Sequence, residues 1–147
     1  MADLPKTVLV LGLGYSGQAV ARRLLAQGVE VAGTVRDPAA RRGDALLRHR
    51  LAADHPLDPL LLDMLARAEA VLCTIPPDAD GDPALRLLRD ALVSSTSLRW
   101  VGYLSSTAVY ASRDGGWIDA ASLADGTTPS ALQRLHAERQ WQALSSG

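Results

Sequence analysis

A glycine-rich turn directly after a short apolar run is the feature that most restricts how this chain can fold. Residues 7–11 are TVLVL, a β-branched run of strand length, and residues 12–17 are GLGYSG, with the spacing G-x-G-x-x-G. Such a run is typical of a strand buried on both faces of a parallel sheet. Residues 18–27 then carry Val20 and Leu24 four positions apart, with paired arginines facing away, which predicts an amphipathic helix.

Each glycine of the turn meets a different demand when strand, turn and helix belong to one βαβ unit. Gly12 permits the tight turn, Gly14 lets a ligand approach the backbone, and Gly17 lets the helix pack closely against the strand. The unpaired N–H groups at the start of the helix favour an anion such as a pyrophosphate. The turn therefore predicts a dinucleotide-binding site, with Tyr15 and Ser16 inside it, rather than a corner that only packs.

Strand-length runs and amphipathic stretches alternate along the rest of the chain. The further expected strands are residues 29–35, 50–53, 70–75 and 98–104, and the further expected helices are 38–47, 60–68, one after Pro83, and about 130–144. This alternation predicts an α/β fold, a Rossmann-type doubly wound parallel sheet of about five strands with helices on both faces. The whole chain, residues 1–147, is of a length for one domain.

Composition excludes several classes of protein. The net charge of −1 at pH 7 and the scattered arginines offer no basic surface for nucleic acid. The single cysteine, Cys73, rules out an internal disulfide and fits a reducing compartment, and the three histidines lack metal-ligand spacing. No apolar run approaches the length of a membrane helix, and the N-terminus does not resemble a signal peptide. We therefore expect a cytoplasmic protein with no membrane partner.

The end of the second expected strand bears on which dinucleotide is bound. About twenty residues beyond the glycines, an NAD site has an Asp or Glu that binds the ribose hydroxyls. Arg36 stands here instead, where a guanidinium can bind a 2′-phosphate through two hydrogen bonds. The neighbouring Asp37 takes the NAD role if the strand runs one residue longer. These residues favour NADP and leave NAD open.

Three consecutive hydroxyl side chains, Ser105, Ser106 and Thr107, follow the fifth expected strand. A buried strand does not accommodate such a cluster easily, because each hydroxyl taken out of water needs a partner. Ligands of an open parallel sheet bind beyond the carboxyl ends of its strands, so these hydroxyls share an edge with the glycine turn. We therefore assign the cluster to a site.

Together, G-x-G-x-x-G after the first strand and SSTAVY after the fifth resemble the short-chain dehydrogenase/reductase superfamily, and most of all its extended, NAD-dependent epimerase/dehydratase type. The resemblance covers the chain from Val8 to about Leu144. It implies that Ser106 hydrogen-bonds the reacting oxygen of a small-molecule substrate, largely sugar nucleotides in this family. It also implies cofactor contacts from Thr74 and Pro76, after the fourth strand, and from Asp54 near the adenine.

The chain departs from that family at the acid/base pair. The family has a tyrosine, a lysine four residues later and commonly a glutamate after four more. Glu138 matches the glutamate, which puts Arg134 in the place of the lysine and Ser130 in that of the tyrosine, all on one helical face. Serine without a neighbouring base is a poor proton donor at neutral pH, and neither Tyr110 nor Tyr15 is a convincing substitute.

The sequence therefore predicts an NAD(P)-binding domain of an atypical short-chain dehydrogenase/reductase, an oxidoreductase, epimerase or dehydratase. The alternative is a non-catalytic NADP-dependent sensor or scaffold. Because the family adds a C-terminal substrate domain, we expect the chain to be the N-terminal portion of a longer protein. The fifth strand is expected to be an open edge, which leaves a homo-oligomer open as well.

Overall fold

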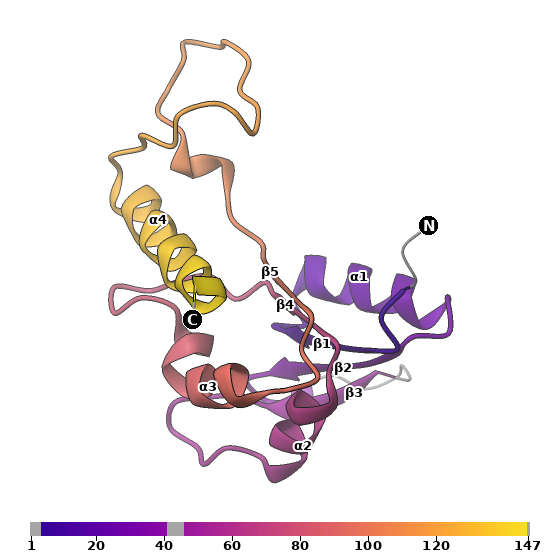
Figure 1. Ribbon diagram of the computed structural model, residues 1–147. Helices are drawn as coiled ribbons and strands as arrows, with labels where there is room; N and C mark the ends of the chain where they lie inside the picture. The colour runs from indigo at the N-terminus through magenta and orange to yellow at the C-terminus, as the bar shows by residue number, and fades with distance from the viewer. Residues whose placement is uncertain (1–3, 41–45, 147) are drawn as a thin grey trace.

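The computed structural model describes residues 4–40 and 46–146 (Figure 1). Within them, five strands form one parallel sheet in the order β3-β2-β1-β4-β5. The strands are β1 (Thr7–Leu11), β2 (Glu30–Val35), β3 (Leu47–Arg50), β4 (Ala70–Cys73) and β5 (Trp100–Tyr103). The helices are α1 (Tyr15–Leu25), α2 (Pro59–Arg67), α3 (Pro83–Ser94) and α4 (Pro129–Gln142), with short 3-10 turns η1 (Pro38–Ala40), η2 (Thr107–Val109) and η3 (Ala143–Ser146). This topology confirms the predicted Rossmann-type fold.

Alternate residues of β1 face two separate hydrophobic clusters, one on each face of the sheet. Val8 and Val10 belong to the cluster that packs with α1. Leu9 and Leu11 belong to the larger cluster, which includes the apolar faces of α2 and α3 and, from α4, Trp141. Helices therefore lie on both faces of the sheet, as predicted (Figure 1). None of the helices in the described ranges is long and apolar enough to cross a membrane.

Helices α2, α3 and α4 begin in the same way, with a capping oxygen followed by proline. The capping pairs are Asp58-Pro59, Asp82-Pro83 and Thr128-Pro129, and each capping side chain accepts a hydrogen bond from a backbone N–H of the first turn. Such a cap is worth about 1 kcal/mol, and proline at the first position has no N–H to leave unpaired. Helix α1 differs, because its N-cap is Gly14 and no side chain caps it. The first N–H groups of α1 therefore remain available to a ligand.

The third strand lies three residues earlier than the predicted 50–53 and overlaps the end of the predicted helix 38–47. Of that helix, residues 38–40 form η1, and 41–45 lie outside the described residues. Because β3 is an edge strand whose sequence is LRHR, pairing with β2 and a buried contact position it, not an apolar pattern of its own. That contact joins His49 Nδ1 to Asp58 Oδ2 at 2.9 Å. Helix α1 likewise begins at Tyr15, three residues before the predicted start, because Gly14 inside the turn is its N-cap.

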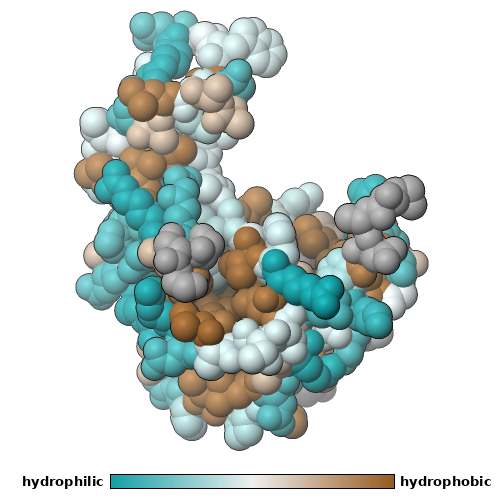
Figure 2. Space-filling view, in the orientation of Figure 1, coloured by the Kyte–Doolittle hydropathy of each residue, from teal (hydrophilic) through white to brown (hydrophobic). Residues whose placement is uncertain are grey.

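One part of the sheet is open to solvent. On the α1 side of β4 and β5, none of the described helices covers Trp100 and Leu104, which are 55% and 46% exposed. The ring of Trp100 lies over Gly102, where a Cβ would come within 2.1 Å of a ring carbon. Figure 2 shows hydrophobic residues gathered below a hollow between the projecting loop after η2 and helix α1. In the described sheet β5 is also an edge strand, so this corner is open both on its face and at its edge.

Candidate functional site

Two threonine hydroxyls from neighbouring strands hold the backbone of the glycine turn. Thr34 of β2 is fully buried, and its Oγ1 accepts a hydrogen bond from Gly12 N at 2.9 Å. Thr74, just after β4, donates from Oγ1 to Gly12 O at 2.6 Å. The turn is thus fixed before any ligand arrives, which reduces the ordering cost of binding. Thr74 was predicted to lie along the cofactor, and its hydroxyl is engaged in supporting the turn.

The three glycines differ in what surrounds them, in the way the motif predicts. Gly12 has a φ of +96°, which favours glycine. A Cβ on Gly17 would lie 2.1 Å from Gly12 O, so the close approach of α1 to the end of β1 requires its absence. A Cβ on Gly14 would meet nothing within 4 Å, so this backbone faces open space. An open backbone at an uncapped helix start is a donor set that fits a pyrophosphate.

The other residues inside the turn fall into two kinds. Tyr15 and Ser16 are exposed, and Tyr15 is 94% accessible, so both are within reach of a ligand at the start of α1. Leu13 is buried instead, and its N donates to Thr34 O at 2.8 Å. Its side chain lies on Gly33 of β2, where a Cβ would come within 2.4 Å of Leu13 Cγ. Leu13 therefore anchors the turn to the neighbouring strand.

Arg36, directly after β2, is exposed, and within residues 4–40 and 46–146 its guanidinium has no ion-pair partner. The Asp37 carboxylate beside it is engaged, since Oδ1 accepts a hydrogen bond from Ala39 N at 3.0 Å and lies 3.5 Å from Arg50 Nη2. The sequence prediction missed Arg50 because it put the third strand too late. The signal that finds it is the strand register, which pairs Val35 with Arg50.

Arg50 is also held from its other side. Its Nη1 lies 2.6 Å from His55 Nε2, and His55 Nδ1 lies 2.9 Å from Asp54 Oδ1. The hydrogen bond from His55 lowers the pKa of Asp54, which is exposed. The residue predicted to approach the adenine thus belongs to a chain of contacts that leads to Arg50. Pro76, the other residue predicted on this edge, is exposed after β4.

At the far side of the sheet, α4 lies against the end of β5. Arg134 Nη1 donates to Tyr103 OH at 3.1 Å and to Leu104 O at 3.3 Å. One turn further along the helix, Glu138 accepts a hydrogen bond from Ser105 Oγ. Arg134 and Glu138 therefore face the site edge together, as their spacing predicts. Ser130, one turn before Arg134, is exposed on the first turn of α4.

The hydroxyl side chains after β5 make different contacts, and the sequence did not predict which residue makes which contact. Ser106 is the N-cap of η2, and its Oγ accepts a hydrogen bond from Ala108 N at 3.2 Å. Ser105, which was assigned to the site with the cluster but given no role of its own, is the hydroxyl that faces α4. Three hydroxyls in a row carry no local signal for which one faces the helix, because the backbone direction after β5 decides it.

Tyr103 is a second residue that the sequence prediction missed. Its ring stacks on Trp141 with centroids 6.0 Å apart, and the guanidinium of Arg134 lies 5.9 Å from its ring centroid. Burial raises the pKa of Tyr103 to about 12, although Arg134 acts in the opposite direction. The phenol therefore keeps its proton at neutral pH. Burial likewise raises the pKa of Cys73 to about 12, so this thiol keeps its proton and is inert at neutral pH.

Helix α4 is positioned by a buried carboxylate at the start of α3. Asp82 is fully buried, and its oxygens accept hydrogen bonds from Leu85 N at 2.9 Å and from Trp141 Nε1 at 2.8 Å. Gln140 Oε1 in turn accepts a hydrogen bond from Asp82 N at 3.0 Å. These contacts satisfy the carboxylate and orient the helix that presents Arg134 to the site edge.

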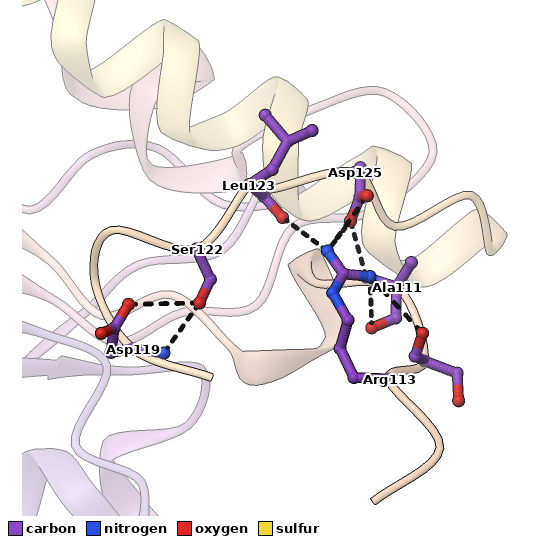
Figure 3. Close-up of polar contacts among 7 residues, drawn as sticks. Ala111, Arg113, Asp119, Ser122, Leu123 and Asp125 are labelled. Atoms are coloured by element: carbon purple, nitrogen blue, oxygen red, sulfur yellow. Dashed lines mark hydrogen bonds and ion pairs between the residues drawn. The ribbon is translucent and has the colours of Figure 1, made fainter. Parts of the chain in front are cut away.

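Residues 110–127 form a loop without strand or helix that projects from the body (Figure 1). Figure 3 shows how its two ends are joined: Arg113 Nη2 donates to both carboxylate oxygens of Asp125, at 2.9 and 3.1 Å. Asp125 also accepts a hydrogen bond from Ala111 N at 3.0 Å. Trp117, near the tip, is fully exposed. The ion pair between Arg113 and Asp125 thus holds the two ends of the loop together, and the loop carries an aromatic side chain, Trp117, that is exposed to solvent.

Comparison with known proteins gave no matching family model and no matching curated sequence. Among solved structures, the chain is similar to a conserved protein of unknown function from Silicibacter pomeroyi DSS (35% identity, TM-score 0.78, covering 95% of this chain and 49% of that one). It is also similar to a protein described as an NAD-dependent epimerase/dehydratase from Methylobacillus flagellatus (26% identity, TM-score 0.74, 94% and 50%). MoeE5, in complex with UDP-glucose and NAD, shares the fold (23% identity, TM-score 0.69, 96% and 50%).

The chain spans about half the length of these structures. Other structural neighbours are described as NAD-dependent epimerase/dehydratase and short-chain dehydrogenase/reductase superfamily proteins, which confirms the resemblance indicated by the two motifs.

Proposed function

We propose that this chain binds a nicotinamide dinucleotide at the glycine turn, as the cofactor domain of an atypical short-chain dehydrogenase/reductase of the epimerase/dehydratase type. The observation that carries the proposal is the open backbone at Gly14, at the start of an uncapped helix, in a turn held rigid by Thr34 and Thr74. The N–H groups of that turn would hold the pyrophosphate. The names of two neighbours, both with bound NAD, support the same cofactor class.

Within this class, NADP is the proposed preference over NAD. Arg36 is exposed at the end of β2, where a guanidinium can reach a 2′-phosphate. The Asp37 carboxylate, the candidate for an NAD-type ribose contact, is already engaged with Ala39 N and faces Arg50. An engaged carboxylate is a weaker acceptor for two ribose hydroxyls, so the balance of charge favours the phosphorylated ribose.

Two groups on the other side of the edge are proposed to hold substrate and cofactor. Because Ser106 Oγ accepts from Ala108 N, its own O–H remains to donate to a substrate oxygen. Arg134 donates from one nitrogen to Tyr103 and Leu104, and its other N–H groups can hold the nicotinamide ribose. When bound, the nicotinamide supplies or accepts a hydride. The proposed substrate is a sugar nucleotide or another small carbonyl or hydroxyl compound, with Ser130 in the place of the proton donor.

A non-catalytic, NADP-dependent sensor or scaffold is the second candidate. The observation that favours it is the pairing of reactive groups at the β5–α4 side: Ser105 with Glu138, and Arg134 with a phenol whose pKa is about 12. A proton donor for reduction must release its proton readily near neutral pH, and Tyr103 does not meet this requirement. A protein of this kind would bind both redox forms and react with neither.

Calorimetric titration of the purified, folded chain with NADPH and with NADH tests the proposal. We expect one site per chain and tighter binding of NADPH. If the folded chain binds neither dinucleotide, the proposed cofactor function is wrong. Turnover of bound NADPH with UDP-sugars or small carbonyl compounds, slowed in Ser106→Ala, would support the enzyme. Binding of both redox forms without turnover would support the sensor.

A further inference from the structure

Arg36 and Arg50 lie at the carboxyl ends of neighbouring strands. The register of β2 and β3 pairs Val35 with Arg50, and Leu51 N donates to Val35 O at 3.0 Å, which fixes that register at the strand ends. Paired backbones in a sheet are about 4.8 Å apart. Two arginine side chains therefore start from adjacent points on the edge where the adenosine end of a dinucleotide would lie.

The guanidinium of Arg50 is oriented by neighbours that leave part of it unused. His55 Nε2 accepts a hydrogen bond from Arg50 Nη1 at 2.6 Å, so in this arrangement His55 Nδ1 carries the proton and donates to Asp54 Oδ1 at 2.9 Å. On the other side, the ion pair with Asp37 is long, at 3.5 Å. The Arg50 side chain is 36% exposed. Since a guanidinium has five N–H donors, others remain for an incoming anion.

The ion pair between Arg67 and Glu30 gives a standard for what a purely structural pair looks like in this protein. The distance from Arg67 Nη1 to Glu30 Oε1 is 2.6 Å. The pair joins α2 to the first residue of β2, at the amino ends of the strands, away from the proposed ligand site. The pair between Arg50 and Asp37 is looser by nearly an ångström and lies on the ligand edge. Arg50 is oriented by His55 but only weakly paired with Asp37, so it is better suited to binding an anionic ligand than to stabilising the fold.

We propose that Arg50 is a specificity-determining residue, which together with Arg36 binds the 2′-phosphate of NADP and offsets the charge of Asp37. This inference rests on the proposed dinucleotide site. Arg50 binds the phosphate from β3 and Arg36 binds it from β2. In the absence of that phosphate, Arg50 still neutralises Asp37, which weakens the acidic contact that unphosphorylated ribose requires. The two arginines thereby make the site discriminate between NADP, which has the 2′-phosphate, and NAD, which lacks it.

Calorimetric titration of wild type and Arg50→Ala with NADPH, NADH, 2′,5′-ADP and 5′-ADP tests this inference. Loss of charge-assisted hydrogen bonds predicts that Arg50→Ala binds NADPH and 2′,5′-ADP about tenfold more weakly. Its affinity for NADH and 5′-ADP should be unchanged or higher, because Asp37 is released. Arg50→Lys, which keeps the charge without the planar pair of donors, should fall between wild type and Arg50→Ala.

Arg67→Ala is the control, since it removes a partly exposed, ion-paired arginine near the amino ends of the strands, away from the proposed site, and it should alter no affinity. Circular dichroism and thermal unfolding show whether each variant folds. The inference is wrong if Arg50→Ala weakens NADPH and NADH by the same factor, if it changes neither, or if wild type prefers NADH. Failure of wild type to bind any of the four probes would instead overturn the proposed dinucleotide site itself.

Discussion

The two sides of the ligand edge are constructed differently. On the β1–α1 side, buried side chains hold the backbone: Thr34 and Thr74 fix Gly12, and the backbone at Gly14 faces open space. On the β5–α4 side, polar side chains hold one another, as Arg134 does with Tyr103. The first side presents unused donors, and the second presents donors and acceptors that are largely paired.

From this difference we expect binding of the pyrophosphate to depend on the first side, and contacts made by side chains to depend on the second. A backbone site depends on close packing, so it is sensitive to one added carbon atom and insensitive to side-chain chemistry. At a site of paired side chains, a ligand can bind only if one side chain leaves its partner, so binding depends on the chemistry of those side chains. Four substitutions sharpen this comparison, and they are taken from the largest expected loss of stability to the smallest.

Gly17→Ala should have the largest effect. Its Cβ would lie 2.1 Å from Gly12 O, which is backbone that cannot turn aside, so we expect a loss of about 3 kcal/mol in the free energy of unfolding and no dinucleotide binding. Urea denaturation measures the first and calorimetry the second. The control is Gly14→Ala, whose Cβ meets nothing within 4 Å. It should lose about 1 kcal/mol at most, from a weaker N-cap, and still bind dinucleotide poorly. Equal stability of the two variants would contradict the packing argument.

Thr34→Val should be next, because it removes the acceptor of the Gly12 N–H at a position that is only 1% exposed. An unpaired buried donor costs about 1–3 kcal/mol. Thr7→Val is the matched control on β1, since its hydroxyl makes only a 3.5 Å contact with Glu30. We expect a clear fall in the urea midpoint for Thr34→Val and a smaller one for Thr7→Val. Similar midpoints would show that the threonine does not hold the turn.

Tyr103→Phe tests the other side of the edge. It removes the hydroxyl that accepts from Arg134 and should lower stability by about 1 kcal/mol at pH 7. Because the change lies away from the glycine turn and Arg134 keeps its hydrogen bond to Leu104 O, dinucleotide affinity should fall much less than in Gly14→Ala. An affinity loss as large as that of Gly14→Ala would show that the two sides are not separate.

The same variant has a pH signature. Burial raises the pKa of Tyr103 to about 12 from its usual 10.0, so the unfolded chain loses this proton at lower pH than the folded one. The stability that the protonated phenol contributes is therefore complete below pH 10 and declines as the pH rises toward 12. The stability advantage of wild type over Tyr103→Phe should therefore be constant up to about pH 9 and shrink between about pH 10 and pH 12. An advantage that stays constant across that range would contradict the raised pKa.

Arg113→Ala should have the smallest global effect. The ion pair with Asp125 is partly exposed, so its loss should change the free energy of unfolding by less than about 1 kcal/mol. Locally the effect should be larger, because this pair joins the two ends of the projecting loop (Figure 3). Limited proteolysis should cut within residues 112–126 faster in the variant, while the rest of the chain stays resistant. An unchanged cutting rate would show that the conformation of the loop does not depend on the ion pair between Arg113 and Asp125.

Much of the fold follows from local signals. Asp58 before Pro59 predicts the start of α2, and the leucines that face one way after Pro83 predict α3, whose Leu85, Leu88 and Leu92 are buried. These signals act within one helical turn, so the sequence alone carries them. The third strand was misplaced because β3 has almost no apolar pattern, and its position depends on its pairing with β2 and on the contact of His49 with Asp58.

The site divides in the same way. The glycine turn was predictable because three glycines at fixed spacing answer three geometric demands of one βαβ unit. The contacts of Arg50 and Tyr103 were not, since they depend on strand register and on how α4 lies against β5. Which serine faces α4 was equally hidden, because it depends on the direction of the backbone after the strand ends.

The placement of Leu13 on Gly33 has a consequence for how this sequence can diverge. Since a Cβ on residue 33 would lie 2.4 Å from Leu13 Cγ, the two positions are not independent. A side chain gained at 33 is tolerable only after residue 13 has become smaller, so the order of substitutions matters. A double-mutant cycle should show strong positive coupling, with Leu13→Ala rescuing part of the stability lost in Gly33→Ala. The G-x-G motif allows any residue at its second position, but in this protein that residue, Leu13, is constrained by its contact with Gly33.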